Sequence, residues 1–367
     1  MTPISADPFF YYKNSVPYIS NYMLSIQRQL RTGLLLTVSY VGNQGHHIME
    51  LMSVNPGNQA LCLSLPGCGP FAEDGAFTTA SGAAYQGTRS GQERRTSGVD
   101  VTNPPTLCSS YVNGCELYQE NTEDASIGNS NYNTLQSTLR YQRGGSQGSL
   151  SYSYAKSIDQ GSNIGEQLDP LDPRHARAIS AWDMKHSVVA NYTWQMPVAW
   201  AAHRHSRLTE GWSLSGTARF TTGLPVTLFD NSDNSLLGTL GNGANNYLLD
   251  TPQQLPGSLH INRNGRNGKP AFNTAIFLEE NLGQLGNARR REFYGPGIEN
   301  FDTTLKKDLA ITDRINMELR LETFNTLNHA QFYGPAAVDG QKNDAAFGDI
   351  ESAAAPRLVQ LAARFSF

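Results

Sequence analysis

Four cysteines have the most distinctive reactivity in this sequence, and they fall into two close pairs. Cys62 and Cys68 form one pair and Cys108 and Cys115 the other, both within stretches rich in Gly, Pro, Ser and Asn. Their spacing suits local disulfides in an oxidising compartment, although four cysteines allow three connectivities. A zinc site is the alternative, but no Cys-x-x-Cys motif is present. Four unpaired thiols are the third possibility.

Other residues with ligand chemistry give a weaker signal. His46-His47 and the pair His203 and His205 could bind a metal, but histidines in predicted loops are more often ordinary surface residues. The run Asp230-Asn-Ser-Asp-Asn234 has the oxygen density of a calcium loop but lacks the Gly and distal Glu of an EF-hand, so we expect a solvated turn. No Ser-His-Asp or paired-carboxylate arrangement stands out. The sequence therefore predicts no enzyme, no metal site and no cofactor.

Composition narrows the class of protein. Charged residues make up 16% of the 367 residues, whereas Gly (34), Tyr (16) and Phe (15) are plentiful, which favours strands and turns. No stretch approaches the roughly 20 consecutive apolar residues of a spanning helix, which excludes a helical membrane protein. With 28 basic and 32 acidic residues, no polybasic surface points to nucleic acid. The first eight residues show no export signal.

Apolar and polar residues alternate with a period of two in nine segments, which predicts β-strands. In the segment 315–324, for example, Ile315, Met317, Leu319 and Leu321 share one face. The nine predicted strands are 18–30, 34–41, 132–143, 150–156, 185–194, 212–222, 301–311, 315–324 and 357–367.

Strand length and the connections between strands favour a membrane. Strands of about 10 to 11 residues, tilted near 45°, rise about 25 Å, which is the height of an outer-membrane apolar band. Short and long connections alternate, as periplasmic turns and extracellular loops do in barrels. The longest are 43–130, which holds the four cysteines, and 223–298. We therefore predict an all-β fold, an antiparallel transmembrane β-barrel.

The eighth strand presents a polar row that would face the barrel lumen. These residues could line a substrate path, or they could form ion pairs that brace the wall. The row consists of Asn316, Glu318, Arg320 and Glu322.

Several motifs, in this order along the chain, resemble Oar-like TonB-dependent receptors. The resemblance covers most of the chain from about Tyr18 onward. The matching stretches are Ser39–His47, Ser130–Ser137, Ser151–Ile158, Gly211–Gly216, Phe301–Asp308 and Leu319–His329.

The resemblance implies a 22-stranded barrel preceded by a plug domain that contacts TonB. No plug precedes Tyr18 here, and nine strands is an odd number whereas bacterial barrels use an even one, so we expect the C-terminal portion of such a barrel. Residues 1–17 would end an extracellular loop, and 18–367 would form the barrel segment. The last strand also resembles the signal read by the barrel-assembly machinery. That pattern maps onto Leu361, Ala363, Phe365 and Phe367.

These observations lead to a functional expectation. In the outer membrane, in contact with its lipid, the complete receptor would bind a large nutrient, such as a carbohydrate or other polymer, at its outer loops and import it when energised through the TonB complex. TonB would act through the missing plug region. Oar-like relatives are linked to polymer uptake or protein export. The alternatives are a passive porin-like or adhesin-like barrel and a secreted soluble β-protein, and no nucleic-acid partner is expected.

Overall fold

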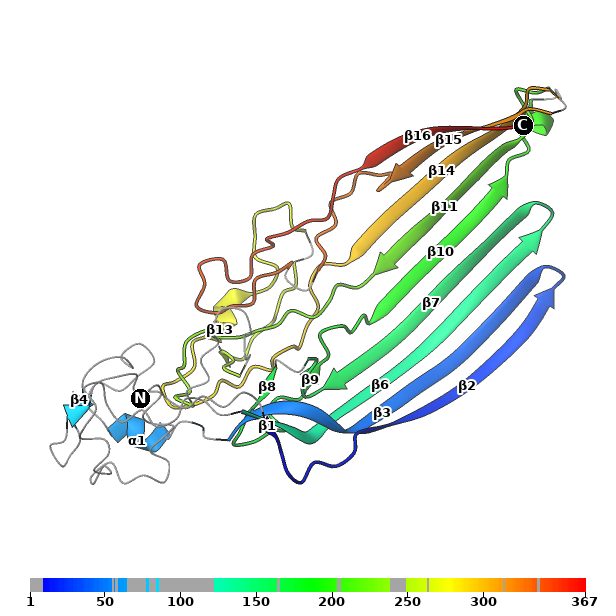
Figure 1. The fold of residues 1–367 in the computed structure, drawn as a ribbon. Coiled ribbons are helices and arrows are strands. Elements are labelled where there is room, and N and C mark those ends of the chain that lie inside the picture. The colour runs from blue at the N-terminus through cyan, green and yellow to red at the C-terminus, as the bar shows by residue number, and fades with distance from the viewer. Residues whose placement is uncertain are drawn as a thin grey trace.

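The computed structural model describes residues 9–54, 56, 59–64, 77–78, 84–85, 122–163, 166–202, 206–237, 249–262, 264–312, 314–334 and 337–367. One large sheet dominates this part of the chain (Figure 1). Among these residues, no helix is long and apolar enough to cross a membrane.

Each of the nine predicted strands is present in the sheet. Neighbouring long strands pair antiparallel, and each lies beside the one that precedes it in the chain, in the order β16-β15-β14-β11-β10-β7-β6-β3-β2. The prediction of an all-β antiparallel fold is confirmed. The strands are β2 (Tyr18–Arg31), β3 (Leu34–Ser53), β6 (Thr122–Arg143), β7 (Ser146–Asp159), β10 (His186–Gln195), β11 (Trp212–Thr221), β14 (Ile298–Ala310), β15 (Asn316–Phe324) and β16 (Leu358–Ser366).

The strand register separates an apolar face from a polar face across the whole sheet. Leu214, Leu305, Leu321 and Leu361 lie directly opposite one another on β11, β14, β15 and β16. Shifted by one residue, the same four strands carry Ser215, Thr304, Glu322 and Gln360 on the other face. The apolar row stays uncovered, because Leu361 remains 79% exposed. Side chains of a soluble core would be packed instead.

Short turns gather at one end of the sheet and long connections at the other (Figure 1). Gly33, at φ +77°, closes the turn between β2 and β3, and an added Cβ would collide with the carbonyl oxygen of Gln142 on the adjacent β6. Gly144, at φ +58°, closes the turn between β6 and β7. Left-handed backbone favours glycine, which explains why Gly occupies these positions in the two turns. The β10–β11 connection holds the helix α3 (Val198–Ala201).

Lys307 lies two residues after Leu305 and therefore on the apolar face of β14. Its charge is accommodated at the short-turn end of the sheet. The side chain is 5% exposed. Its Nζ donates to the carbonyl oxygen of Arg207 at 2.7 Å and to that of Glu210, and lies 5.4 Å from the ring centre of Trp212. The long stem thus covers apolar surface while the ammonium reaches turn carbonyls.

Two strands are much longer than the sequence predicted. β3 continues from the predicted end at Val41 to Ser53, and β6 begins at Thr122 rather than Tyr132. The predicted loop 43–130 therefore begins and ends inside this paired ribbon. The extension was missed because its apolar alternation fades, although its backbone pairing continues through bulges near Ile48. Backbone pairing can continue where the side chains no longer alternate between apolar and polar.

Two further expectations fall in this extension. The segment 1–17, expected to end an extracellular loop, contains β1 (Phe9–Phe10), which pairs in parallel with β6. His46 and His47 were placed in a loop, but they lie in β3, where the His46 ring stands 5.1 Å from the ring of Tyr18. These residues reinforce the outer end of the ribbon.

The long connections near the end of the chain pack into a compact body, which we call the loop unit. It comprises the described residues of 224–296 and 325–357 and has its own hydrophobic core. Phe272 lies at the centre, in ring contact with Phe277, Phe293 and Phe347. The core residues are Val226, Leu228, Ala271, Phe272, Ile276, Phe277, Ala288, Phe293 and Val338.

Short elements complete the described structure. Two of them, β8 and β9, join the long connections to the outer ends of β3 and β7. They are α1 (Gln59–Ser64), β4 (Phe77–Thr78), β5 (Ala84–Tyr85), β8 (Gln167–Leu168), β9 (Ala178–Ile179), β12 (Gln253–Gln254), η2 (Thr274–Ile276) and β13 (Phe277–Leu278).

Candidate functional site

The polar row predicted on β15 meets a matching charged row on β14. In register, Arg320 lies opposite Lys306 and Glu318 opposite Asp308. Glu318 pairs with Arg320 at 2.6 Å and with Lys306 at 3.6 Å, and Lys306 pairs with Asp308 at 2.9 Å. Partly exposed pairs of this kind contribute about 0–1 kcal/mol each. The predicted residues on this face are Asn316, Glu318, Arg320 and Glu322.

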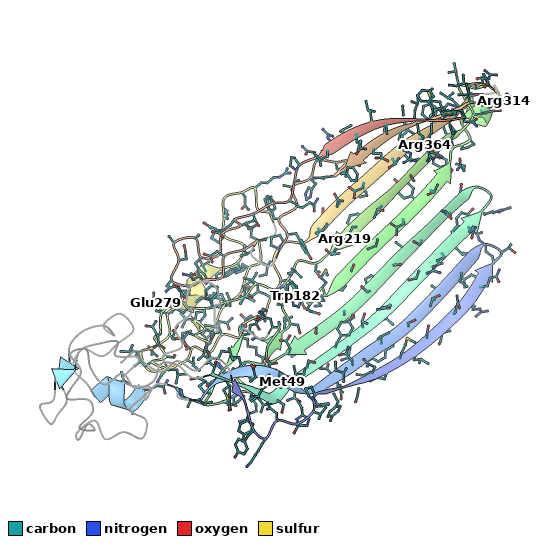
Figure 2. The ribbon with its side chains drawn as sticks, in the orientation of Figure 1. Met49, Trp182, Arg219, Glu279, Arg314 and Arg364 are labelled. Atoms are coloured by element: carbon teal, nitrogen blue, oxygen red, sulfur yellow. The ribbon has the colours of Figure 1, made fainter. Side chains whose placement is uncertain are left out.

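This geometry favours the bracing interpretation for most of the row. The ion pairs run between neighbouring residues of the wall, so Glu318, Arg320 and Lys306 largely satisfy one another. The row also borders open grooves, because Glu322 lines one on the polar face and Asn316 and Glu318 line another. The groove lined by Glu322 is mixed in character, because Tyr141, Tyr192 and Phe324 line it together with the polar side chains Arg140, Asn191, Asp302 and Glu322. Arg364 continues the polar face toward the short-turn end (Figure 2).

The C-terminal pattern lies on the apolar face of the edge strand β16. Leu361 lies opposite Leu321, Ala363 opposite Leu319, and Phe365 opposite Met317. Phe367 follows one residue after the strand ends, instead of within it, and is fully exposed. The alternation predicted for these four residues is therefore present from Leu361 to Phe365. Their recognition by an assembly machinery remains a prediction.

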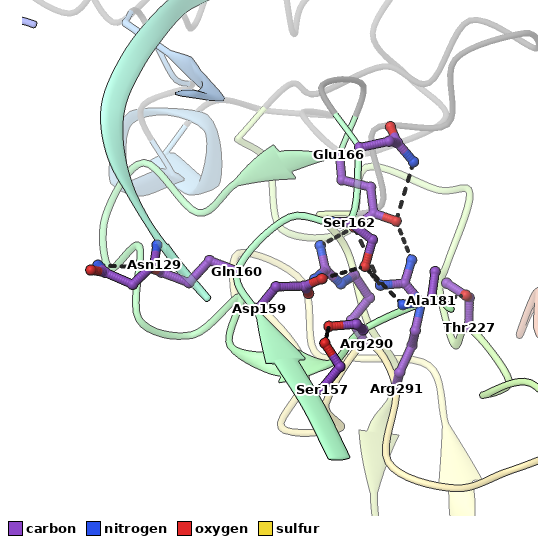
Figure 3. Close-up of polar contacts among 12 residues, drawn as sticks. Asn129, Ser157, Asp159, Gln160, Ser162, Glu166, Ala181, Thr227, Arg290 and Arg291 are labelled. Carbon is purple, nitrogen blue, oxygen red and sulfur yellow. Dashed lines mark hydrogen bonds and ion pairs between the residues drawn. The ribbon is translucent and has the colours of Figure 1, made fainter. Parts of the chain in front are cut away.

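A buried ionic cluster joins the loop unit to the outer ends of β3 and β7 and to the segment that follows β7 (Figure 3). Arg290 Nη2 lies 3.2 Å from Asp159 Oδ1, and its Nη1 lies 2.5 Å from Glu166 Oε2. Arg291 pairs with both carboxylate oxygens of Glu166. The fifth member, Glu50, is 2% exposed and comes from the extension of β3. The ionic cluster therefore links β3, β7, the segment after β7 and the loop unit.

Neutral side chains complete the contacts of Arg291. Its Nε donates to Thr227 Oγ1 at 2.9 Å, and its Nη1 donates to Ser162 Oγ at 3.2 Å. Ser162 in turn donates to Asp159 Oδ2 at 2.7 Å. A guanidinium presents several donors in a fixed plane, so one buried arginine can bind acceptors from several segments at once.

Charge in the cluster balances when Glu50 is protonated. Burial raises the pKa of Glu50 to about 8, and Asp159 and Glu166 add to this effect against the attraction of Arg290. Burial would also raise the pKa of Glu166, but Arg290 and Arg291 hold it below its ordinary value. Two carboxylates then face two guanidinium groups. Neutrality overall is the condition under which buried charges are best tolerated.

Glycines allow the Glu50 carboxylate to reach this position. A Cβ on Gly161 would collide with Glu50 Oε2, and one on Gly128 would collide with its Cγ. The β3 bulge between Ile48 and Glu50 shifts the register at this place. Sequence reasoning missed the cluster, although the run Arg289-Arg290-Arg291 in a chain poor in charge was a usable signal.

The remaining predicted residues have mixed outcomes. The turn Asp230–Asn234 was expected to be solvated, and this was wrong, because Asp230 is 6% exposed and Asp233 4% exposed. The loop unit packs over it, which the local sequence did not indicate. The predictions for the cysteines and for two of the histidines lie outside the described residues. They concern Cys68, Cys108, Cys115, the side chain of Cys62, His203 and His205.

The apolar and polar faces, the antiparallel order and the alternating connections together define a membrane-spanning β-barrel wall. A protein-family model described as an outer membrane beta barrel domain matches residues 2–360, so the chain belongs to that family. Its location is the outer membrane. The apolar face of the sheet is then the lipid-facing side, and the polar face is the lumenal side.

Comparison with solved structures finds several similar chains. The outer membrane transporter YddB from Escherichia coli is similar over 99% of this chain and 34% of that chain, with a TM-score of 0.45 and 9% sequence identity. The chain thus spans about a third of the length of that protein. No curated protein matches the sequence.

Breaking the ionic cluster should release the loop unit. In Arg291→Met, Glu166 loses one of its two buried partners, and removing one partner of a buried pair costs about 3–5 kcal/mol. We expect faster hydrogen exchange in residues 224–229 and 288–293, measured by mass spectrometry. The control is Arg174→Met, which removes an exposed pair with Asp172 and should leave exchange unchanged. Equal exchange in wild-type and Arg291→Met proteins would show that the cluster does not hold the loop unit.

The protonation of Glu50 should make the loop unit sensitive to alkali. Because the pKa in the folded state, about 8, lies above the unfolded value of 4.5, the stabilisation is complete below pH 4.5 and is lost as pH rises through about 8. Glu50→Gln cannot ionise, so it should gain stability relative to wild type as pH increases. Denaturant unfolding of both proteins at each pH measures this, with the exposed Glu351→Gln as control. Parallel profiles for wild type and Glu50→Gln would contradict the assignment.

Proposed function

We propose that this chain forms part of the wall of a TonB-dependent outer-membrane transporter that imports a large nutrient. The substrate class would be a carbohydrate or another polymer, bound first at the outer loops. The single observation that carries this proposal is the open polar face of a sheet that is still unclosed after nine strands.

Sheet width supports a broad lumen. Barrels of about eight strands have an interior that side chains fill, whereas wider ones enclose a channel or a plug. Within the described residues, β2 and β16 pair on one side each and do not pair with each other. A closed barrel that contains this wall therefore needs further strands, and its lumen would be wide enough for a large solute.

The lumenal surface supports passage of a hydrated solute. Arg140, Asn191, Asp302 and Glu322 line the groove on the polar face, so hydroxyl-rich or charged molecules could exchange water for these groups. Above it, the ionic cluster fixes the loop unit to the wall. A firmly placed loop unit would offer a defined binding surface at the mouth of the barrel.

Energy coupling and assembly rest on the resemblance to Oar-like receptors. A plug domain would supply the gate and the contact with the TonB complex. The barrel-assembly machinery would read Leu361, Ala363, Phe365 and Phe367. Outer-membrane lipid would cover the apolar face, and no nucleic acid would bind.

Transport in the native cell tests the proposal. Cells that lack this protein should fail to accumulate a fluorescently labelled polymer in the periplasm, and cells that lack TonB should fail for the same polymer. The physical reason is that a plugged barrel opens only when energy reaches it from the inner membrane. Uptake is measured by microscopy across a panel of labelled polysaccharides and proteins.

The alternatives give different outcomes. Uptake that depends on this protein but persists without TonB would indicate a passive porin-like barrel. Loss of surface attachment with no change in uptake of any polymer would indicate an adhesin-like barrel. Either result would refute energised import.

A further inference from the structure

Three arginines lie on the lumenal face of the sheet, each on a different strand. The register places Arg140 of β6 in one row with Thr217 of β11 and Asp302 of β14. Arg219 follows Thr217 by two residues, so it lies on the same face. Arg364 lies on this face of β16, and Figure 2 labels it together with Arg219. All three side chains are exposed, and we call them the lumenal arginines.

The lumenal arginines have no side-chain partner in the part of the chain that the structure describes. No ion pair or side-chain hydrogen bond joins any of them to another described residue. Arg364 lies opposite Glu318 in the register, but that carboxylate pairs with Arg320 and Lys306 instead. Three guanidinium groups therefore face the lumen with unused hydrogen-bond donors.

The acidic residues of the same face are already paired. Outside the strand extensions and the ionic cluster, the described strands carry acidic residues on this face in β14 and β15 only. Asp302 Oδ1 accepts from Asn300 Nδ2 at 3.0 Å and from the amide of Asn325 at 2.8 Å. The unpaired charge on the lumenal face is therefore positive. The ion pairs of the other acidic residues are Asp308 with Lys306 at 2.9 Å, Glu318 with Arg320 at 2.6 Å and Glu322 with Arg320 at 3.8 Å.

Uncharged hydrogen-bonding groups accompany Arg140. Ser149, Asn191 and Thr217 follow it in the same row, and Thr217 Oγ1 donates to Asn191 Oδ1 at 2.8 Å. Arg140 and Asn191 also line one groove on the polar face. A guanidinium binds a carboxylate through two parallel hydrogen bonds, and hydroxyl and amide groups suit the hydroxyls of a sugar. The row thus combines groups for both parts of an acidic sugar.

The spacing of the lumenal arginines suits a chain rather than a small ion. The rows of Arg219 and Arg364 meet β14 at Asn300 and Asp308, which lie about 26 Å apart along an extended strand. No small anion spans that distance, whereas a polymer with repeated negative groups does. Single-stranded nucleic acid would need aromatic rings for base stacking, but the register neighbours of Arg219 are Val189 and Asn300. These features favour an acidic polysaccharide.

We propose that the lumenal arginines form a cationic path that selects an acidic polysaccharide, whose sugars carry carboxylate groups. The inference rests on the proposed import function and names its substrate class. Exposed guanidinium groups stay hydrated, so each contact is weak and the polymer passes from one arginine to the next. Their attraction acts over about 8 Å at physiological salt, so each arginine acts on the part of the polymer beside it.

Matched polymers test the selectivity. Cells that carry this protein would be given fluorescent dextran and carboxymethyl-dextran of equal length, which differ in charge but share one backbone. We expect TonB-dependent accumulation of carboxymethyl-dextran in the periplasm at a level on the order of tenfold above that of dextran. Added salt should reduce this ratio, because it screens exposed charges.

Variants assign the selectivity to the arginines. Arg140→Gln combined with Arg219→Gln removes two charges and should lower uptake of carboxymethyl-dextran about tenfold without lowering uptake of dextran. Arg140→Lys combined with Arg219→Lys keeps both charges and should retain most of the selectivity. Arg174→Gln removes an exposed charge that pairs with Asp172 between β8 and β9, and it should behave as wild type. Resistance of each barrel to SDS without heating checks that the variants are folded.

Two kinds of failure can be told apart. TonB-dependent uptake that is equal for the two dextrans, or unchanged selectivity in the folded glutamine variant, would overturn the cationic path and leave energised import standing. Stronger uptake of polyglutamate or of single-stranded DNA than of carboxymethyl-dextran would overturn the assignment to a polysaccharide. Absence of TonB-dependent uptake for every polymer would refute the proposed function, and this inference with it.

Discussion

Lateral pairing of backbone groups inside lipid is the constraint on which the rest of this structure depends. A strand that crosses a bilayer must satisfy its N–H and C=O groups on neighbouring strands, because no water is available there. Its side chains must also serve two solvents, lipid on one face and water on the other. The row Leu214, Leu305, Leu321 and Leu361, with Ser215, Thr304, Glu322 and Gln360 behind it, meets both requirements.

Beyond the membrane the chain is in water, and packed side chains and buried ion pairs hold it in place of strand pairing alone. The loop unit has an aromatic core around Phe272, as a small soluble domain would. It is fixed to the strands by buried charges, with Arg290 and Arg291 reaching Asp159 and Glu166. Long side chains can bridge between a rigid wall and an irregular loop, and their pairing requirement makes the junction specific.

The sequence predicted the elements governed by local periodicity and missed those governed by distant contacts. All nine strands were found because a lipid face imposes alternation on each one separately. The extension of β3 was missed because residues past Val41 have no lipid face and are held by pairing with β6. The ionic cluster joins Glu50, Glu166 and Arg290, which are far apart in the chain, and burial of Asp230 depends on packing by other segments. The run Arg289-Arg290-Arg291 marks one side of the cluster, but no local pattern encodes which distant residues it contacts.

Accessibility along β15 tests most directly whether the sheet divides lipid from lumen. Single cysteines would be placed at each position from Met317 to Glu322, with the four native cysteines replaced by serine, in intact outer membranes. We predict that a fluorescent label on the cysteine at position 317, 319 or 321 is quenched by a lipid-soluble quencher. Cysteines at positions 318, 320 and 322 should react with a water-soluble thiol reagent. Uniform reaction with the water-soluble reagent at all six positions would contradict a membrane-spanning wall.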